Sequence, residues 1–129
     1  MKPTIVEQHR LLEEFFAESR VALAGEETDA MAQALAFLQE ALEAHFELED
    51  RLHHPPIRAL RPQHAPTLRS ITDGHARFRA QLAAILERIG EGALAEARAW
   101  FEDLSLGFAA HEAVEEGLLR AIEAEAHGE

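Results

Sequence analysis

The sequence contains no cysteine and no tyrosine, and it is poor in proline and aromatic residues. Its 129 residues include 5 Pro, and aromatic residues make up 6% of the chain. Without cysteine the protein can form no disulfide, no thiolate metal site and no thiol nucleophile. β-branched residues are few, whereas alanine, leucine and glutamate dominate, and this composition is typical of helices rather than sheets. We therefore predict an all-α protein.

The sequence also lacks an excess of basic residues and any long apolar run. It has 12 Lys+Arg against 24 Asp+Glu, a net charge of −12 at pH 7, which argues against nucleic acid and anionic membranes as partners. No apolar run approaches the length that spans a bilayer, and the segment MKPTIVEQHR lacks the apolar core of a signal peptide. We therefore expect a cytoplasmic protein, either a monomer or a small homo-oligomer.

Turn and cap residues divide the chain into four predicted helices. The helices should run from Thr4 to Gly25, from Thr28 to just before His53, from Pro66 or Thr67 to Gly90, and from about Ala93 to near His127. The segment Thr4–Glu7, TIVE, is a capping-box sequence, and Thr28 is expected to cap the second helix. The second helix should stop before HHPP, because Pro55 and Pro56 lack a backbone N–H and disfavour helix before them.

Apolar residues recur along each predicted helix at alternating steps of three and four, which places them on the face that packs in a core. On the second helix this stripe consists of Met31, Leu35, Leu38, Leu42, His45, Glu49 and Leu52. The stripes of the other helices carry one histidine each, namely His9, His75 and His111. Short turns at 25–28 and 90–92 make neighbouring helices antiparallel. We therefore predict an up-down-up-down four-helix bundle, with residues 1–129 as a single domain.

The four histidines on the stripes should lie at one height in this bundle. Each lies 15 to 19 residues from its nearest turn, or roughly 22–28 Å at about 1.5 Å per residue. Glu49 and Glu115 each follow one of them by four residues and join the same layer. Imidazoles and carboxylates in a dry core are costly without a counter-charge. The layer therefore predicts a metal site, and a polar layer satisfied by its own hydrogen bonds is the alternative.

Two metal ions account for this layer better than one. Each ion would take two histidines if Glu49 and Glu115 both bridged with their two oxygens, as in the dinuclear sites of other helix bundles. Mixed imidazole and carboxylate donors suit iron, with manganese and zinc as alternatives. A solvent-derived oxo or hydroxo bridge would bring each ion to about five ligands and leave a position open for a small molecule.

The remaining candidates lie off the stripes. The histidines expected at the surface are His53, His54, His64 and His127. Glu13, four residues after His9, is a possible extra ligand, although its neighbours predict a solvated flank. The aromatic residues expected to serve packing are Phe15, Phe16, Phe78, Phe101 and Phe108, and Trp100 is expected to be partly exposed.

The segments that carry the predicted ligands also resemble a known family. EQHRLLEEF, AHFELEDRL, DGHARFRAQL and AAHEAVEEGLL are similar to the four ligand-bearing helices of hemerythrin-like proteins, which have the HHE cation-binding domain. The resemblance covers nearly the whole chain. It implies a hemerythrin-like bundle with a non-haem diiron centre that binds dioxygen or related small molecules. The ligands that it implies are His9, His45, Glu49, His75, His111 and Glu115, with the two glutamates bridging.

The chain departs from the oxygen-carrying hemerythrins at two positions. The carriers have a further histidine one turn after the third-helix ligand, where this chain has Arg79. They also have an aspartate five residues after the last histidine, whereas Glu115 follows His111 by four. Four histidines therefore replace five, so that either each iron has an open position or another group fills the gap. The Arg79 side chain either extends to solvent or keeps its head near the centre.

These features favour a diiron protein that binds, senses or detoxifies dioxygen, peroxide or nitric oxide. If it is an enzyme, it should be a diiron oxidoreductase that acts as a peroxidase, an oxidase or a nitric oxide reductase. No residue on the stripes beyond the predicted ligands suits a general acid or base, which argues against a dedicated hydrolase. The alternatives are a metal-binding or iron-responsive module without turnover, and a structural or partner-binding helical bundle.

Overall fold

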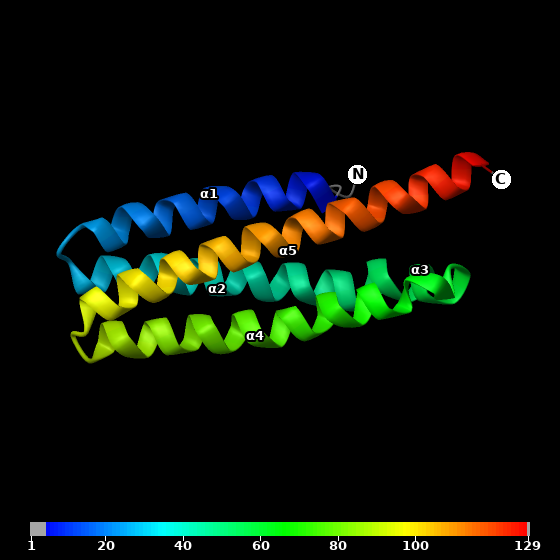
Figure 1. Cartoon of the computed structure of the whole chain (residues 1–129). Helices are drawn as coiled ribbons and strands as arrows, with labels where there is room; N and C mark the ends of the chain where they lie inside the picture. Colours follow the sequence, from blue (N-terminus) through cyan, green and yellow to red (C-terminus); the bar gives the residue numbers. More distant parts are fainter. Residues whose placement is uncertain (1–4, 129) are drawn as a thin grey trace.

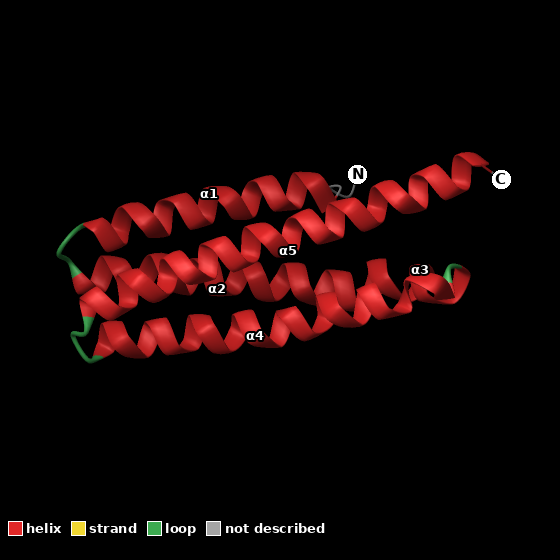
Figure 2. Ribbon diagram, viewed as in Figure 1, coloured by secondary structure: helices red, strands yellow, loops and turns green. Residues whose placement is uncertain are grey.

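The computed structural model describes residues 5–128, and these residues are almost entirely helical (Figure 1, Figure 2). The four long helices are α1 (Ile5–Ala24), α2 (Thr28–Leu48), α4 (Ala65–Gly90) and α5 (Leu94–Gly128). Between α2 and α4 lie a π-helical turn (Glu49–His53), the short helix α3 (His54–Leu60) and a 3-10 turn (Pro62–His64). The predicted all-α four-helix bundle is confirmed.

The four long helices run alternately up and down, as Figure 1 shows. Around the bundle α1 packs against α2, α2 against α4, α4 against α5, and α5 against α1. The helices α2 and α5 therefore face each other across a diagonal of the bundle. The short turns that follow α1 and α4 lie at one end, whereas α3 lies at the other end beside the carboxyl-terminal half of α5 (Figure 1).

The ends of the helices agree with most of the predicted boundaries. The first helix stops before Gly25, whose N–H donates to the carbonyl of Ala22 at 3.1 Å. In the turn between α4 and α5, Gly92 has a φ of 78°, a backbone conformation that glycine adopts without strain. The predicted cap Thr4 lies outside the described residues. Thr28 is not a cap, because the preceding Glu27 occupies that position and Thr28 is the first helical residue.

The second helix ends before HHPP, as predicted, but the helical backbone does not stop there. The backbone stays helical through a π turn, in which the N–H of His54 donates to the carbonyl of Glu49, five residues earlier. Pro55 and Pro56 then lie in the first turn of α3, where a missing N–H costs little.

The π turn also changes which residues face the interior. Leu52, predicted on the apolar stripe, is 50% exposed, whereas His54, predicted at the surface, is only 1% exposed. In an ordinary α-helix, residues five apart point about 140° away from each other. A π turn needs more residues to complete one turn, so His54 comes back to the face that carries Glu49.

The interior of the bundle contains two apolar clusters. The main cluster fills the half next to the short turns, and its largest side chains include Phe46, Phe78, Phe101 and Met31. The small cluster near α3 consists of Leu68, Ile71 and Leu118, with Ile57 and Ile122 packed against it. Along α4, His75 comes between the two clusters, and along α5 the same holds for His111 and Glu115. A polar layer therefore separates the two clusters.

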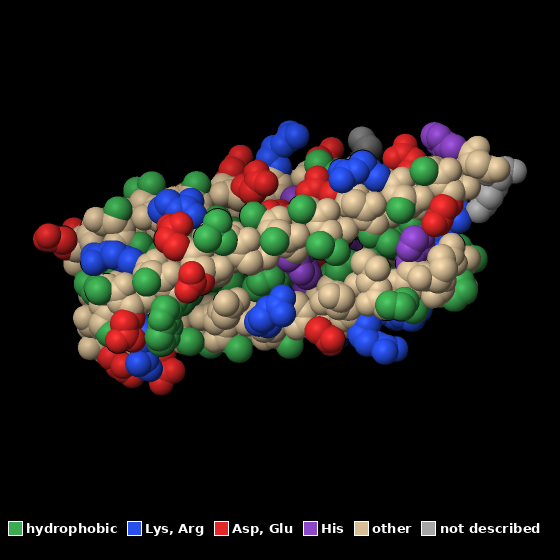
Figure 3. All heavy atoms as spheres, viewed as in Figure 1, with side chains coloured by type: hydrophobic (Ala, Val, Ile, Leu, Met, Phe, Trp, Pro, Cys, Tyr) green, Lys and Arg blue, Asp and Glu red, His purple; other side chains and the backbone are tan. Residues whose placement is uncertain are grey.

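The surface carries acidic and basic side chains interspersed with isolated apolar ones. Figure 3 shows this mixture on one face of the molecule, together with small areas of exposed histidine. Trp100 is 38% exposed, as predicted, and the guanidinium of Arg88 lies 5.4 Å from the centre of its ring. Among residues 5–128, no helix has both the length and the apolar character that crossing a membrane requires.

Candidate metal centre

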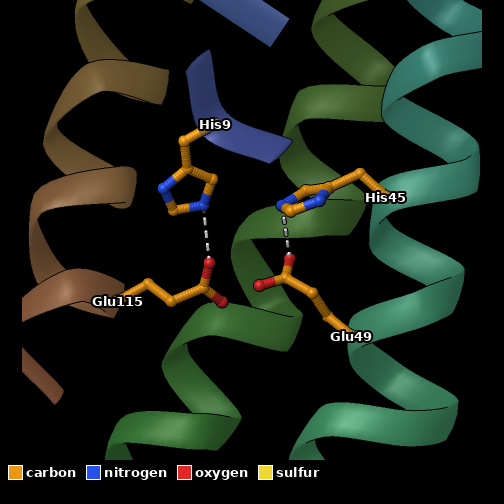
Figure 4. Close-up of side chains that lie close together, drawn as sticks. All are labelled: His9, His45, Glu49 and Glu115. Atoms are coloured by element: carbon orange, nitrogen blue, oxygen red, sulfur yellow. Dashed lines mark hydrogen bonds and ion pairs between the residues drawn. The ribbon is translucent and has the colours of Figure 1, made fainter. Parts of the chain in front are cut away.

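The polar layer brings the predicted ligands together from all four long helices. Glu115 and Glu49 approach each other from opposite helices, and His9 and His45 lie beside them (Figure 4). Nε2 of His9 is 2.8 Å from Oε1 of Glu115, and Nε2 of His45 is 3.1 Å from Oε1 of Glu49. One donor atom from each of these four buried residues lies within 4.8 Å of the others. This group has the composition and the spacing of a metal site.

The other two predicted ligands, His75 and His111, lie on the α4–α5 side of the same layer. Nε2 of His75 is 3.2 Å from Oε1 of Glu49, and its ring centre is 5.4 Å from that of His111. Two donors bound at right angles to one ion, each about 2.1 Å from it, are about 3 Å apart. The nitrogen–oxygen distances around Glu49 are therefore those of donors that share an ion.

Several polar atoms of the layer have no hydrogen-bond partner, although they are buried. Both oxygens of Glu49 and the Nε2 atoms of His75 and His111 are in this state. The Glu49 side chain is 0% exposed, so water does not satisfy it either. Burying a carboxylate without donors is strongly unfavourable. A bound cation would remove this cost, and the residues present therefore fit a metal.

The protonation states in the layer are also those of metal ligands. Burial raises the pKa of Glu49, but the imidazoles of His45 and His75 outweigh burial and lower this pKa to about 2. Burial, assisted by the charge of nearby His75, lowers the pKa of His111 to about 4. Glu49 is therefore ionised and His111 is neutral near pH 7, and both forms have lone pairs available for a cation.

The outer nitrogens of three histidines are held by oxygen atoms. Nδ1 of His45 is 2.8 Å from Oε1 of Gln8, Nδ1 of His75 is 3.2 Å from Oδ1 of Asp50, and Nδ1 of His9 is 3.2 Å from Oε2 of Glu116. Amide and carboxylate oxygens only accept, so each Nδ1 donates its hydrogen. A ring whose Nδ1 keeps its hydrogen can offer the lone pair of Nε2, which faces the centre, to a cation. None of these three oxygen partners was predicted from the sequence.

His54 also lies in the polar layer, although it was predicted at the surface. Its Nε2 is 3.3 Å from Oε2 of Glu115 and 3.8 Å from Oε2 of Glu49, so the ring lies within the layer. Burial lowers the pKa of His54, which keeps the ring neutral. The prediction that His54 is a surface residue was wrong because it assumed an ordinary helix that ends before the prolines. Two prolines directly after a helical stripe are the sequence signal for such an irregular turn.

The other three histidines outside the stripes differ from His54 in burial and contacts. His53 is half-buried rather than exposed, and His127 is exposed. The half-buried His64 lies 2.9 Å from Oε1 of Glu125, a contact that ties the 3-10 turn to α5. Glu13 is exposed, as predicted for a solvated flank. A different acid, Glu112, is buried beside His9, and burial raises its pKa to about 7.

The Arg79 side chain extends outward rather than toward the centre. Its Nε donates to Oε1 of Glu43, and its guanidinium carbon lies 5.2 Å from the centre of the Phe46 ring. The Phe46 ring in turn stacks on His75, with ring centres 4.1 Å apart. The guanidinium is therefore separated from the polar layer by an aromatic ring, and the first of the two alternatives for Arg79 is correct.

Comparison with known proteins agrees with this geometry. The model of the hemerythrin HHE cation-binding domain matches residues 2–122, which is nearly the whole chain. No curated protein and no solved structure matches the chain. The matched domain is described as cation-binding, and the buried histidine and glutamate group supplies donors for a cation. The chain therefore belongs to the hemerythrin HHE cation-binding domain family.

Proposed function

We propose that the protein is a non-haem diiron protein that binds a small molecule, dioxygen or nitric oxide in the first place, at a carboxylate-bridged centre. The proposed ligands are His9, His45, Glu49, His75, His111 and Glu115. The observation that carries the proposal is the state of Glu49, a fully buried carboxylate with two imidazole nitrogens 3.1 and 3.2 Å from Oε1 and no hydrogen bond of good geometry to either oxygen. Iron suits this donor set, with manganese and zinc as alternatives.

The surrounding residues fix the donors and keep water out. Gln8, Asp50 and Glu116 hold the Nδ1 protons of three histidines, so that the opposite nitrogens are oriented before any metal binds. On the side of the short turns, Phe46 and Phe108 lie directly against the histidine rings. When bound, the iron would supply the redox chemistry, and the bundle supplies the fixed donors and the dry surroundings.

An apolar groove between α1 and α2 supports a small uncharged molecule as the ligand. The groove has a volume of about 210 Å³ and is lined by Leu12, Phe15, Ala44 and His45, among others. It therefore runs from the surface to one of the proposed ligands. Dioxygen and nitric oxide enter apolar surroundings at little cost, whereas ions pay a large desolvation penalty. The proposal also includes peroxide as a ligand, and a role in sensing or in enzymatic turnover. It further includes a location in the cytoplasm.

Metal content tests the dinuclear assignment. Protein loaded with iron(II) without oxygen and then freed of excess metal should hold about two ions per chain. Glu49→Ala and Glu115→Ala should each lower this content to one ion or less, because each removes a bridge. Glu47→Ala is the matched control on the same helix, since its side chain is 58% exposed. One ion or none in the parent protein would contradict the proposal.

Absorption spectra distinguish the proposed function from simple metal storage. Iron(II)-loaded protein should change its near-ultraviolet and visible spectrum when oxygen or nitric oxide is added. The response should be absent in Glu49→Ala and present in Glu47→Ala. A protein that holds two ions but responds to neither gas would be a metal-binding module without turnover.

A further inference from the structure

One oxygen of each of the two glutamates faces a residue that is not among the six proposed ligands. Oε1 of Glu115 faces His9, and Oε1 of Glu49 faces both His45 and His75, at 3.1 and 3.2 Å. The second oxygens of both carboxylates face a different residue, His54, at 3.3 and 3.8 Å. A glutamate that bridges two ions directs one oxygen to each. His54 therefore lies where the second ion would be bound.

From this position we infer that His54 is a seventh metal ligand, which binds through Nε2 to the ion that the second oxygens of the two glutamates would hold. The inference rests on the proposed metal centre. It concerns a residue that the resemblance to the oxygen carriers does not supply, because their additional histidine corresponds to Arg79. In this chain Arg79 points outward to Glu43, and the π turn instead brings an imidazole close to both glutamates.

The orientation of the His54 ring supports a metal rather than an ordinary hydrogen bond. Its ring lies within 21° of parallel to that of His75, with centres 6.3 Å apart. Asp50 faces the outer nitrogens of both rings, with Oδ1 at 3.2 Å from Nδ1 of His75 and 3.8 Å from Nδ1 of His54. Thr72 in turn donates to Asp50 at 3.4 Å. Asp50 therefore holds the His75 ring by a hydrogen bond and lies near the outer nitrogen of His54, so that Nε2 of both rings is directed toward the centre.

A purely structural role leaves this histidine poorly satisfied. Nδ1 of His54 is buried and has no hydrogen-bond partner, and Nε2 faces two carboxylates that both require donors. A neutral imidazole carries one hydrogen, so it can satisfy one of these acceptors at most. A cation between Nε2 and the two carboxylate oxygens would satisfy all three groups at once.

The π turn explains how the chain delivers this side chain. Glu49 is the first residue of the turn, and His54 closes it by donating its N–H to the Glu49 carbonyl. The same irregularity moves Leu52 out to solvent. Such turns interrupt α-helices at a cost in backbone geometry and often lie at functional sites. A metal ligand at position 54 would explain why the chain adopts this turn despite its cost in backbone geometry.

Nitrogen NMR of the zinc-loaded protein tests the inference directly. Zinc is diamagnetic, and in protein labelled with ¹⁵N-histidine each ring nitrogen reports whether it is protonated, free or metal-bound. We expect metal-bound Nε2 signals from His9, His45, His75, His111 and also His54. His54→Gln should remove one of these signals and leave the other four. It should weaken binding of the second zinc by more than the roughly 10–100-fold that loss of an outer partner costs.

The matched control is His53→Gln, which changes the neighbouring histidine of the same turn. It should leave all five metal-bound signals and both zinc affinities within about twofold of the parent. A His54 signal that stays in the free position while the other four histidines bind zinc overturns the inference but leaves the metal centre intact. If none of the histidines responds to zinc, the proposed metal centre itself fails, and the inference fails with it. The parent spectrum decides between these outcomes even if a variant folds poorly.

Discussion

The α4 backbone comes close to the His111 ring because position 74 carries no side chain. A Cβ atom added at Gly74 would lie 2.8 Å from Nδ1 and 2.9 Å from Cε1 of this ring, closer than real contacts allow. Gly74→Ala should therefore displace His111, lower the metal content and cost about 1–3 kcal/mol of unfolding free energy. Elemental analysis and urea denaturation measure the two effects.

Gly107 offers a matched control on the neighbouring helix. A Cβ at this position would lie 3.6 Å from Cε1 of Phe78, an ordinary contact. Gly107→Ala should keep the metal content of the parent and gain up to about 1 kcal/mol, because alanine favours helix over glycine. If Gly74→Ala retained full metal content, close packing of His111 against α4 would not matter for the site.

At the scale of the elements, the π turn resolves a conflict between the prolines and a continuous helix. In an ordinary α-helix the ring of Pro55 would clash with the carbonyl of Arg51, four residues earlier. Deletion of Leu52 removes one residue from the turn and forces α-helical geometry onto Pro55 and Pro56. We expect this deletion to lower the unfolding free energy by about 3 kcal/mol or more. Chemical denaturation of the metal-free protein measures this change.

The same deletion made in a Pro55→Ala/Pro56→Ala background should cost much less, since alanine tolerates the regular helix. A double-mutant cycle gives the coupling between the deletion and the prolines. Equal costs in the two backgrounds would show that the prolines are not the cause of the π turn.

The helical stripes were predicted correctly from the sequence, whereas the π turn was missed. Apolar periodicity placed His9, His75 and Glu115 in the interior, because each lies within an uninterrupted α-helix where steps of three and four define a face. That rule fails beyond Glu49, so Leu52 was assigned inward and His54 outward. The direction of Arg79 depends on its neighbours Glu43 and Phe46 across the bundle, which periodicity does not reveal.

A contact between α5 and the 3-10 turn should respond to acid. His64 donates to the Glu125 carboxylate and thereby lowers its pKa below the ordinary value of 4.5, with Arg61 assisting. A carboxyl whose pKa is lowered by folding stabilises the protein above pH 4.5, and the stabilisation is lost as pH falls through the folded-state pKa. The Glu125 side chain is 34% exposed and solvent screens its charge, so the effect on global stability should be small.

Glu125→Gln should remove this pH dependence. The difference in melting temperature between parent and variant should therefore be present near pH 6 and shrink as the pH falls below 4.5. Glu123→Gln, a change two residues earlier on α5, is the control and should show no such trend. A difference that stays constant as the pH falls would mean that the contact acts through something other than the charge of Glu125.

At the scale of the whole molecule, metal should contribute a large part of the stability. Without a cation, both oxygens of the buried Glu49 carboxylate and the Nε2 atoms of His75 and His111 have no hydrogen-bond partner. A ligand present at 1,000 times its dissociation constant adds about 4 kcal/mol when only the folded state binds it. The iron- or zinc-loaded protein should thus melt at a clearly higher temperature than the metal-free protein in calorimetry. Identical melting curves would indicate a layer that is satisfied without metal.

The division of the interior into two apolar clusters has a consequence for how the protein opens. The small cluster has three fully buried members, Leu68, Ile71 and Leu118, which is little apolar surface to hold α3 and the end of α5 in place. In the metal-free protein, amide hydrogens in this part should exchange with solvent through local opening. Amides around the main cluster should exchange only through global unfolding. Metal joins donors from α1, α2, α4 and α5 across the boundary, and the two exchange regimes should merge into one. With metal bound, the two parts of the bundle would then unfold together as a single cooperative unit.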